Sequence, residues 1–248
     1  PSPRTTREPM ALSAGSQPPM GAKVGAVVVA AGTSSRMGGI DKIFAPILGL
    51  PLVAYALDQL ESFPPVTQVV LVLDQASVER GRELVSQRRY KKVRPVCPGG
   101  SRRQDSVLLG IQALEPCDWV VIHDGARPCL DHGTLERGLE SAQETGAAVA
   151  GVPVKDTIKL VSPQGWITET PDRDRLWAAQ TPQLFEYDLL WNAHQRCTQP
   201  VTDDAAMLES LGHPVKMFLG SYENLKVTTP EDLAVAETFL KSLKPRVL

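Results

Sequence analysis

The stretch VGAVVVAAGTSSRMGGIDK, from Val24 to Lys42, decides the fold. It opens with an apolar, valine-rich run, which is typical of a strand that is buried on both faces of a parallel sheet. The small residues Ala30, Ala31 and Gly32 end this run, and they allow backbone N–H groups to approach an anion closely. Neither GxGxxG nor GxxxxGK[ST] occurs here, so the stretch predicts neither a dinucleotide-binding loop nor a P-loop.

Strand-like runs alternate with amphipathic stretches along the rest of the chain, which predicts an α/β fold with a mostly parallel sheet. Residues 23–248 are interpreted as one domain, and residues 1–22, which are rich in proline and serine, as a disordered tail. Further strands are expected at 68–73, 119–124 and 147–153, and helices at 51–63, 77–87, 102–114, 134–143 and after Thr229.

Composition excludes several classes of protein. The chain has 248 residues, 42% of them apolar, and a formal net charge of -2, so it lacks the basic excess of a nucleic-acid or anionic-membrane binder. Its apolar runs are far shorter than a membrane span, which needs about 20 residues. The four cysteines have no CxxC spacing, and we expect free thiols in a reducing compartment. A bacterial cytoplasm is the predicted location, with a plastid stroma as the alternative.

Residues 154–175 interrupt the α/β pattern. The segment VKDTIKLVSPQGWITETPDRDR predicts a strand, a Pro-Gln-Gly turn and a second strand, and therefore a projecting β-hairpin. An isolated hairpin is barely stable in water, so the hairpin is expected to dock on a second copy of the chain as a dimerisation arm. Packing on its own domain is the alternative.

Two cations lie in the first loop, Arg36 and Lys42. Fixed positive charges beside a loop that can hold phosphate suit phosphoryl or nucleotidyl transfer, because the transition state of that reaction spreads negative charge over phosphoryl oxygens. The alternative is a solvated basic loop without a ligand.

At this point the sequence resembles a known family. AAGTSSRM followed by Lys42 is similar to the sugar-nucleotide pyrophosphorylase type of nucleotidyltransferase, and motifs further along the chain narrow the resemblance to the 2-C-methyl-D-erythritol 4-phosphate cytidylyltransferases. The resemblance implies a Rossmann-like three-layer nucleotidyltransferase fold. The motifs are PGGSRRQDSV from Pro98, HDGARP from His123, PVKDTIK from Pro153, TPDRDRLWAAQTPQ from Thr170, TDDAAMLE from Thr202 and ENLKVTTPEDL from Glu223.

The resemblance implies a reaction and its residues. CMP would pass from CTP to 2-C-methyl-D-erythritol 4-phosphate, in non-mevalonate isoprenoid synthesis, with release of pyrophosphate. The implied catalytic residues are Arg36, Lys42, Arg173 and Lys226. The implied CTP-binding residues are Ala30, Ala31, Gly32, Gly99, Gly100, Ser101 and Ser106, and the implied substrate-binding residues are Asp124, Gly125, Arg127, Thr157, Thr181 and Thr202.

Asp124 is also the predicted metal ligand. It ends a strand, where a carboxylate that faces a nucleotide would hold Mg²⁺, or another divalent cation, against phosphate oxygens. An N-cap or salt-bridged aspartate is the alternative. Strand alternation directs the neighbouring His123 to the opposite face, so it is expected to be a core histidine. In the family the hairpin arm crosses a dimer axis, which implies that Thr157 and Arg173 serve the site of the partner.

Departures from the family pattern concern three positions. Asp41 stands before Lys42 where relatives usually have proline, Ser101 replaces an acidic residue of some relatives, and Glu223 replaces a common aspartate.

Two other functions stay open. One is a ribitol 5-phosphate cytidylyltransferase, and the other is a non-catalytic nucleotide-binding relative.

Overall fold

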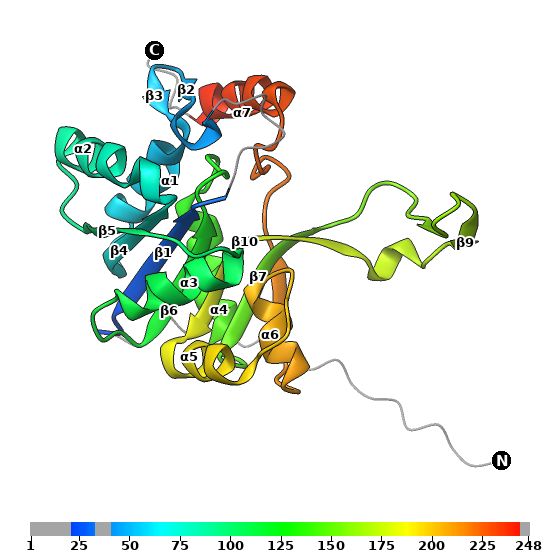
Figure 1. Cartoon of the computed structure of the whole chain (residues 1–248). Coiled ribbons are helices and arrows are strands. Elements are labelled where there is room, and N and C mark those ends of the chain that lie inside the picture. The colour runs from blue at the N-terminus through cyan, green and yellow to red at the C-terminus, as the bar shows by residue number, and fades with distance from the viewer. Residues whose placement is uncertain (1–20, 33–40, 244–248) are drawn as a thin grey trace.

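A seven-stranded sheet forms the centre of the molecule (Figure 1), in a computed structural model that describes residues 21–32 and 41–243. The strand order is β11-β7-β10-β6-β1-β4-β5, and all neighbours pair in parallel except those of β10, which runs antiparallel to β6 and β7. The strands are β1 (Val24–Ala30), β4 (Val66–Leu73), β5 (Val93–Pro98), β6 (Trp119–Asp124), β7 (Ala147–Pro153), β10 (Trp177–Glu186) and β11 (Lys216–Leu219).

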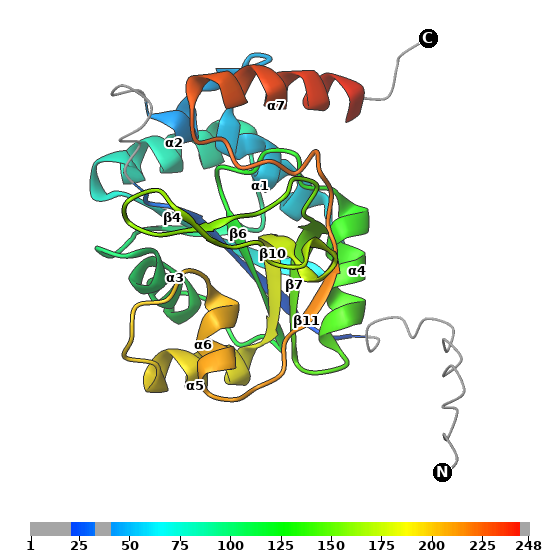
Figure 2. The same cartoon turned by 90° about the vertical axis from the view of Figure 1, so that its right-hand side faces the viewer.

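Helices cover both faces of this sheet, which gives three layers (Figure 2). One face carries α1 (Leu52–Ser62), α2 (Val78–Arg88) and α4 (His132–Ala142), and the other carries α3 (Arg103–Gln112), α5 (Tyr187–Arg196) and α6 (Asp204–Ser210). The last helix, α7 (Pro230–Leu243), packs beside a small sheet of β2 (Pro46–Ile47) and β3 (Leu50–Pro51). Short 3-10 helices are η2 (Lys42–Phe44), η3 (Gln75–Ser77) and η4 (Arg173–Arg175).

Strand β1 shows how the sequence builds the layers. All its residues are buried, and successive side chains enter different cores. Ala26 and Val28 pack with α1 and α4, whereas Val27 and Val29 pack with α3. A strand that is covered on both sides must be apolar at every position, as the opening run of the sequence predicts. The predicted α/β three-layer architecture with a mostly parallel sheet is therefore confirmed.

The segment 154–175 contains a hairpin, but its strands are shorter than expected. Only β8 (Leu160–Val161) and β9 (Ile167–Glu169) pair, and Gly165, at φ +86°, makes the turn between them. Figure 1 shows this hairpin projecting away from the sheet. Its large apolar side chains are exposed, and Trp166 retains 76% of its surface. The role of the hairpin in dimerisation stays a prediction.

Two parts of the sequence analysis lie outside the described residues. They are the loop 33–40 and residues 1–20 of the predicted tail. Within the described ranges, none of the helices combines the length and the apolarity that crossing a membrane requires.

Candidate active site

A cleft of about 560 Å³ opens at the carboxyl ends of β1 and β6. This edge of a parallel sheet is where α/β proteins bind their ligands, and the volume is that of a small-molecule site. The lining combines backbone from the first loop with charged side chains from four other segments. Its residues are Val29, Ala30, Ala31, Gly32, Lys42, Ile43, Gly100, Ser101, Arg102, Arg103, Ser106, Asp124, Ala126, Lys226 and Thr228.

One wall is the turn between β5 and α3. The backbone N–H of Gly100 donates to Oγ of Ser106 at 3.1 Å, and the hydroxyl of Ser101 donates to Asp105 at 3.0 Å. A side chain at position 99 would collide with Ala31 and Ser106, so glycine is required for the turn to lie against the end of β1. The turn is therefore fixed beside the first loop, as a wall that offers backbone groups to a ligand.

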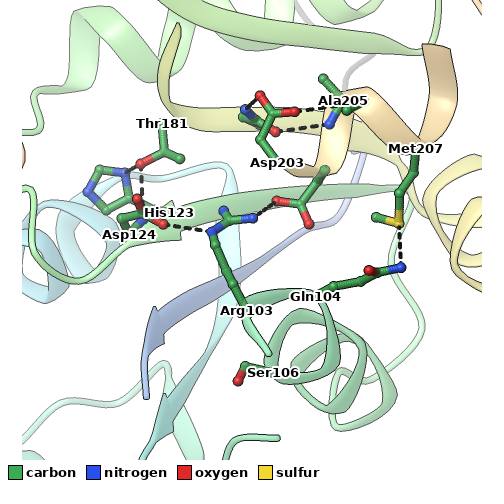
Figure 3. Close-up of polar contacts among 12 residues, drawn as sticks. Arg103, Gln104, Ser106, His123, Asp124, Thr181, Asp203, Ala205 and Met207 are labelled. Atoms are coloured by element: carbon green, nitrogen blue, oxygen red, sulfur yellow. Dashed lines mark hydrogen bonds and ion pairs between the residues drawn. The ribbon is translucent and has the colours of Figure 1, made fainter. Parts of the chain in front are cut away.

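An ionic cluster around Asp124 also lines the cleft. Oδ1 of Asp124 accepts from Nε of Arg103 at 3.1 Å (Figure 3). Oδ2 accepts from Nζ of Lys226 at 2.7 Å. Nη1 of Arg103 donates to Oδ2 of Asp204, again at 2.7 Å. Two cations and two carboxylates are thus joined in one chain of contacts that starts in the interior and ends in the cleft.

The electrostatics of the cluster keep Asp124 ionised. Burial raises the pKa of this carboxyl, but the charges of Arg103 and Lys226 outweigh burial and hold the pKa well below its usual range. Burial lowers the pKa of Arg103, but Asp204 and Asp124 together raise it above the ordinary value. The cluster therefore holds the ionised carboxylate of Asp124 between two basic side chains, Arg103 and Lys226.

Lys42 enters the cleft from η2. Asp41 is the N-cap of this short helix, because its Oδ1 accepts from the backbone N–H of Ile43 at 3.1 Å. The second oxygen of Asp41 faces Nη1 of Arg80 at 3.5 Å. The aspartate that departs from the family pattern thus orders the backbone that carries Lys42. Arg36, the other predicted catalytic cation of this loop, lies outside the described residues.

His123 is the core histidine that strand alternation predicts. It is fully buried, and its two ring nitrogens pair with the carbonyl oxygen of Arg127 and with Oγ1 of Thr181. Burial lowers the pKa of His123 to about 4, so the ring is neutral at neutral pH. It does not line the cleft, which leaves it no direct part in proton transfer there.

Thr181 and Arg127, both predicted to bind substrate, are buried beside the cleft. The Thr181 hydroxyl accepts from the backbone N–H of Asp124 at 3.0 Å. Nη1 of Arg127 donates to the carbonyl oxygen of Asn224 at 2.6 Å. In the single chain both side chains brace the segments that carry Asp124 and Lys226, and their contact with a substrate stays a prediction.

Other predicted residues lie outside the lining. Gly99 and Gly125 adjoin it and contribute close backbone packing, and a side chain at 125 would collide with Ala30. Thr157, Arg173 and Thr202 are exposed and away from it. Nη1 of Arg173 donates to the carbonyl oxygen of Lys155 at the base of the arm, so a single chain does not bring Arg173 into its own cleft.

Sequence reasoning missed Arg102, Arg103, Ala126 and Thr228 as lining residues, and Asp204 as a partner of Arg103. The motif PGGSRRQDSV contains both arginines, but as helix-start residues they are indistinguishable from surface charges. Only their closeness in sequence to the turn at Gly100 could have indicated that they line the cleft.

The donor set fits a magnesium ion only if a nucleotide supplies most of the ligands. In the described part of the chain, His, Cys, Asp and Glu side chains form no group of three or more that could hold a metal. Among the described residues, Asp124 is the one carboxylate side chain that lines the cleft, and Glu223 is not part of the lining. Each Asp124 oxygen keeps a second lone pair, and Mg²⁺ commonly binds one carboxylate together with substrate phosphates.

Comparisons with known proteins agree on one family. The family model described as 2-C-methyl-D-erythritol 4-phosphate cytidylyltransferase matches residues 24–242. The protein of that name from Dehalococcoides mccartyi strain 195 is 48% identical over 219 residues, which cover 88% of this chain and 96% of the relative. The one from Desulforamulus reducens is 44% identical over 222 residues, which cover 87% and 95%.

Solved structures give the same result. The crystal structure of 4-diphosphocytidyl-2C-methyl-D-erythritol synthase from Anaerococcus prevotii superposes with a TM-score of 0.79 at 25% identity, and the match covers 89% of this chain and 99% of that one. The 2-C-methyl-D-erythritol 4-phosphate cytidylyltransferase of Thermus thermophilus gives a TM-score of 0.69 at 28% identity, with coverage of 87% and 98%.

Proposed function

Because this chain belongs to the 2-C-methyl-D-erythritol 4-phosphate cytidylyltransferase family, we propose that it transfers CMP from CTP to 2-C-methyl-D-erythritol 4-phosphate. The products are 4-diphosphocytidyl-2-C-methyl-D-erythritol and pyrophosphate, in the non-mevalonate route to isoprenoid precursors. The observation that carries the proposal is the cluster of Lys226, Asp124 and Arg103, which lines one cleft together with Lys42 and the turn at Gly100.

The acceptor needs no general base. A phosphate monoester has its second pKa near 6 and is mostly a dianion at neutral pH, so its oxygen is already a nucleophile. This oxygen attacks the α-phosphorus of CTP, and the bond from the α-phosphorus to the bridging oxygen breaks as pyrophosphate leaves. The residues are left with alignment and charge neutralisation, for which the ionised cluster is suited.

The cations divide this work. Lys42, together with Arg36, would neutralise the triphosphate beside the first loop and stabilise the charge that develops on the phosphoryl oxygens. Lys226 would hold the acceptor phosphate, since Nζ has three donors and Asp124 takes one of them. The turn at Gly100 and Ser101 would hold cytosine and ribose, where a pocket of backbone groups excludes purines by size.

A magnesium ion would be held by Asp124 and by oxygens of the triphosphate. It would supply Lewis-acid stabilisation of the charge on those oxygens. Asp124 is suited to this because it stays ionised and because no other carboxylate of the described residues lines the cleft.

Association into a homodimer through the hairpin arm belongs to the same proposal. Arg173 and Thr157 do not line the cleft of their own chain, and the arm exposes Trp166, Ile167 and Val161. An arm that reaches the neighbouring cleft would bury these side chains and bring the arginine to the acceptor.

For location we propose a bacterial cytoplasm, which the bacterial relatives and the free cysteines support.

The test measures pyrophosphate release from CTP and Mg²⁺, with methylerythritol 4-phosphate and ribitol 5-phosphate offered separately. Release with the first acceptor alone is expected, and release with ribitol phosphate alone would contradict the proposal. Asp124→Asn should lower turnover by about 100-fold or more. Asp118→Asn is the matched control, since Asp118 adjoins the other end of β6 and its carboxylate accepts from the backbone of Lys23. Its turnover should stay unchanged.

A further inference from the structure

Arg103 lies between two carboxylates that differ in their surroundings. On one side it holds Asp124, which lines the cleft, and on the other it holds Asp204, whose side chain is 1% exposed. Its own side chain is 26% exposed, so the guanidinium spans from the cleft wall to the interior (Figure 3). The planar fork of arginine suits this bridge, because it presents donors at fixed angles to both partners.

The interior end of the bridge is anchored on the sheet. Asp204 is the first residue of α6, and Gln183 of β10 fixes the start of that helix. The Gln183 side chain donates to Asp203 at 2.9 Å and accepts from the backbone N–H of Ala205 at 3.2 Å. The residues on both sides of Asp204 are thus tied to a central strand, which leaves its carboxylate little freedom to follow a moving arginine.

The cleft end of the bridge controls how Asp124 meets Lys226. Arg103 holds Oδ1 of Asp124, so the carboxylate turns only Oδ2 toward Nζ of Lys226. If Arg103 were absent, both oxygens could turn to Lys226 and occupy the ammonium that the acceptor phosphate requires. Asp204, whose pKa burial raises even beside Arg103, would also lose its partner in the interior.

We propose that Arg103 is a positioning residue for Asp124 and that Asp204 is its anchor. This inference rests on the proposed function, because the property that it explains is turnover at Asp124 and Lys226. The pair does more than stabilise the fold. It fixes the orientation of the one carboxylate in the described lining and keeps Lys226 available for phosphate.

Stability and positioning can be separated by two variants. Arg103→Met leaves Asp204 buried without its cation, and the melting temperature should fall. Arg103→Met combined with Asp204→Leu removes both charges, and replacing a whole buried ion pair by apolar side chains is often neutral or stabilising. The double variant should therefore regain most of the lost melting temperature. Its kcat should stay about 10- to 100-fold below that of the unaltered chain, the usual loss when a group that supports a site ligand is removed.

Arg88→Met combined with Asp58→Leu is the matched control. Arg88 and Asp58 join α2 to α1 at 2.7 Å and do not line the cleft. This control should leave kcat and both KM values unchanged. Arg103→Lys is the second test. Lysine keeps the charge but replaces the planar fork by a single ammonium, so it holds Asp124 less rigidly and kcat should fall by about tenfold in a chain that remains folded.

The outcomes distinguish the inference from the function on which it rests. An unaltered chain that releases no pyrophosphate with methylerythritol 4-phosphate contradicts the proposed function. If that chain is active and kcat returns along with the melting temperature in the Arg103→Met, Asp204→Leu variant, the pair is only structural and the inference is wrong. Unchanged kcat in Arg103→Lys would overturn it equally. Low kcat at restored stability supports it.

Discussion

Nζ of Lys226 lies 2.7 Å from Oδ2 of Asp124, although 102 positions separate the two residues in the sequence. The pair joins the segment that follows β11 to the end of β6, and it lies on the wall of the cleft. The Lys226 side chain is 40% exposed, whereas that of Asp124 is only 10% exposed, so the ammonium is the member of the pair that solvent and a ligand can reach. The Lys226 ammonium is therefore interpreted as a binding group for the acceptor phosphate.

Replacing Lys226 by glutamine should lower kcat/KM for the acceptor by about 100-fold or more, because the variant loses the positive charge that would hold its phosphate. Asp124 keeps Arg103, so the fold should be retained. Lys216→Gln, which breaks a surface pair with Glu144, is the control and should leave kcat/KM unchanged. Steady-state pyrophosphate release measures kcat/KM for both variants. Equal values in the two variants would show that Lys226 does not bind the acceptor.

Asp41→Ala should loosen η2 and misplace Lys42, with a fall in kcat of up to about tenfold. Asp74 is a matched control, because it caps η3 in the same way, through the backbone N–H groups of Ala76 and Ser77, and does not line the cleft. Asp74→Ala should lower the melting temperature to a similar extent while kcat stays constant. A kcat that is unaffected in both variants would show that the cap does not serve Lys42.

Arg173→Ala should lower kcat far more than it weakens CTP binding, because Arg173 lies on the arm and is assigned to the acceptor. Mixing this variant with Lys42→Ala chains should restore part of the activity, since a mixed dimer would contain one complete site. Calorimetric CTP binding and turnover of the mixture are the measurements. No restoration, with subunit exchange demonstrated, would contradict a shared site.

Trp166→Glu should dissociate the proposed dimer, because a charge would replace a side chain that is 76% exposed at the tip of the arm. Val235→Glu is a suitable control, as Val235 is an exposed apolar residue on α7. Light scattering would report the mass of each variant. If the unaltered chain is already monomeric at catalytic concentrations, the arm has another role.

His194 predicts a pH dependence of stability. Burial, and then the charge of Arg103, lower the pKa of His194 from 6.5 to about 4, and among the described residues Nε2 has no hydrogen-bond partner. The unfolded chain therefore binds more protons between these values, and stability falls as the pH drops from about 6.5 to about 4, by up to about 3 kcal/mol for this group.

His194→Leu should reduce that loss, and thermal melts from pH 7 to pH 4 measure it. His123, whose pKa burial also lowers to about 4, leaves a residual slope in the variant. An identical slope with and without His194 would show that this ring is not buried in its neutral form.

The layered fold could be predicted because its information is local. Strands β1, β4, β6 and β7 are apolar runs, and turn residues separate these runs from the helices. Strands β5 and β11 were not predicted, because most of their positions are not buried, and neither was β10. Pro182 interrupts its pattern, and the pairing with β7 shifts register between Ala179 and Gln183 to accommodate the interruption. The antiparallel insertion is decided by tertiary contacts with β6 and β7, which no local pattern records.

The candidate site divides in the same way. The first loop, the glycine turn, Asp124 and Lys226 belong to motifs and could be predicted. The role of Arg103 could not be predicted, because it depends on two partners, Asp124 and Asp204, that lie 21 and 101 positions away in the sequence. The residues of the arm were predicted to be functional, but a single chain does not bring them to the cleft.

The central claim is that the α-phosphorus of CTP becomes bonded to the phosphate of methylerythritol 4-phosphate. Phosphorus NMR of the reaction mixture tests it most directly, because the diphosphate of the product gives a pair of coupled signals. We predict these signals together with pyrophosphate in equal amount, both dependent on the acceptor. Formation of CMP and pyrophosphate alone, or no change in the spectrum of CTP, would contradict the account.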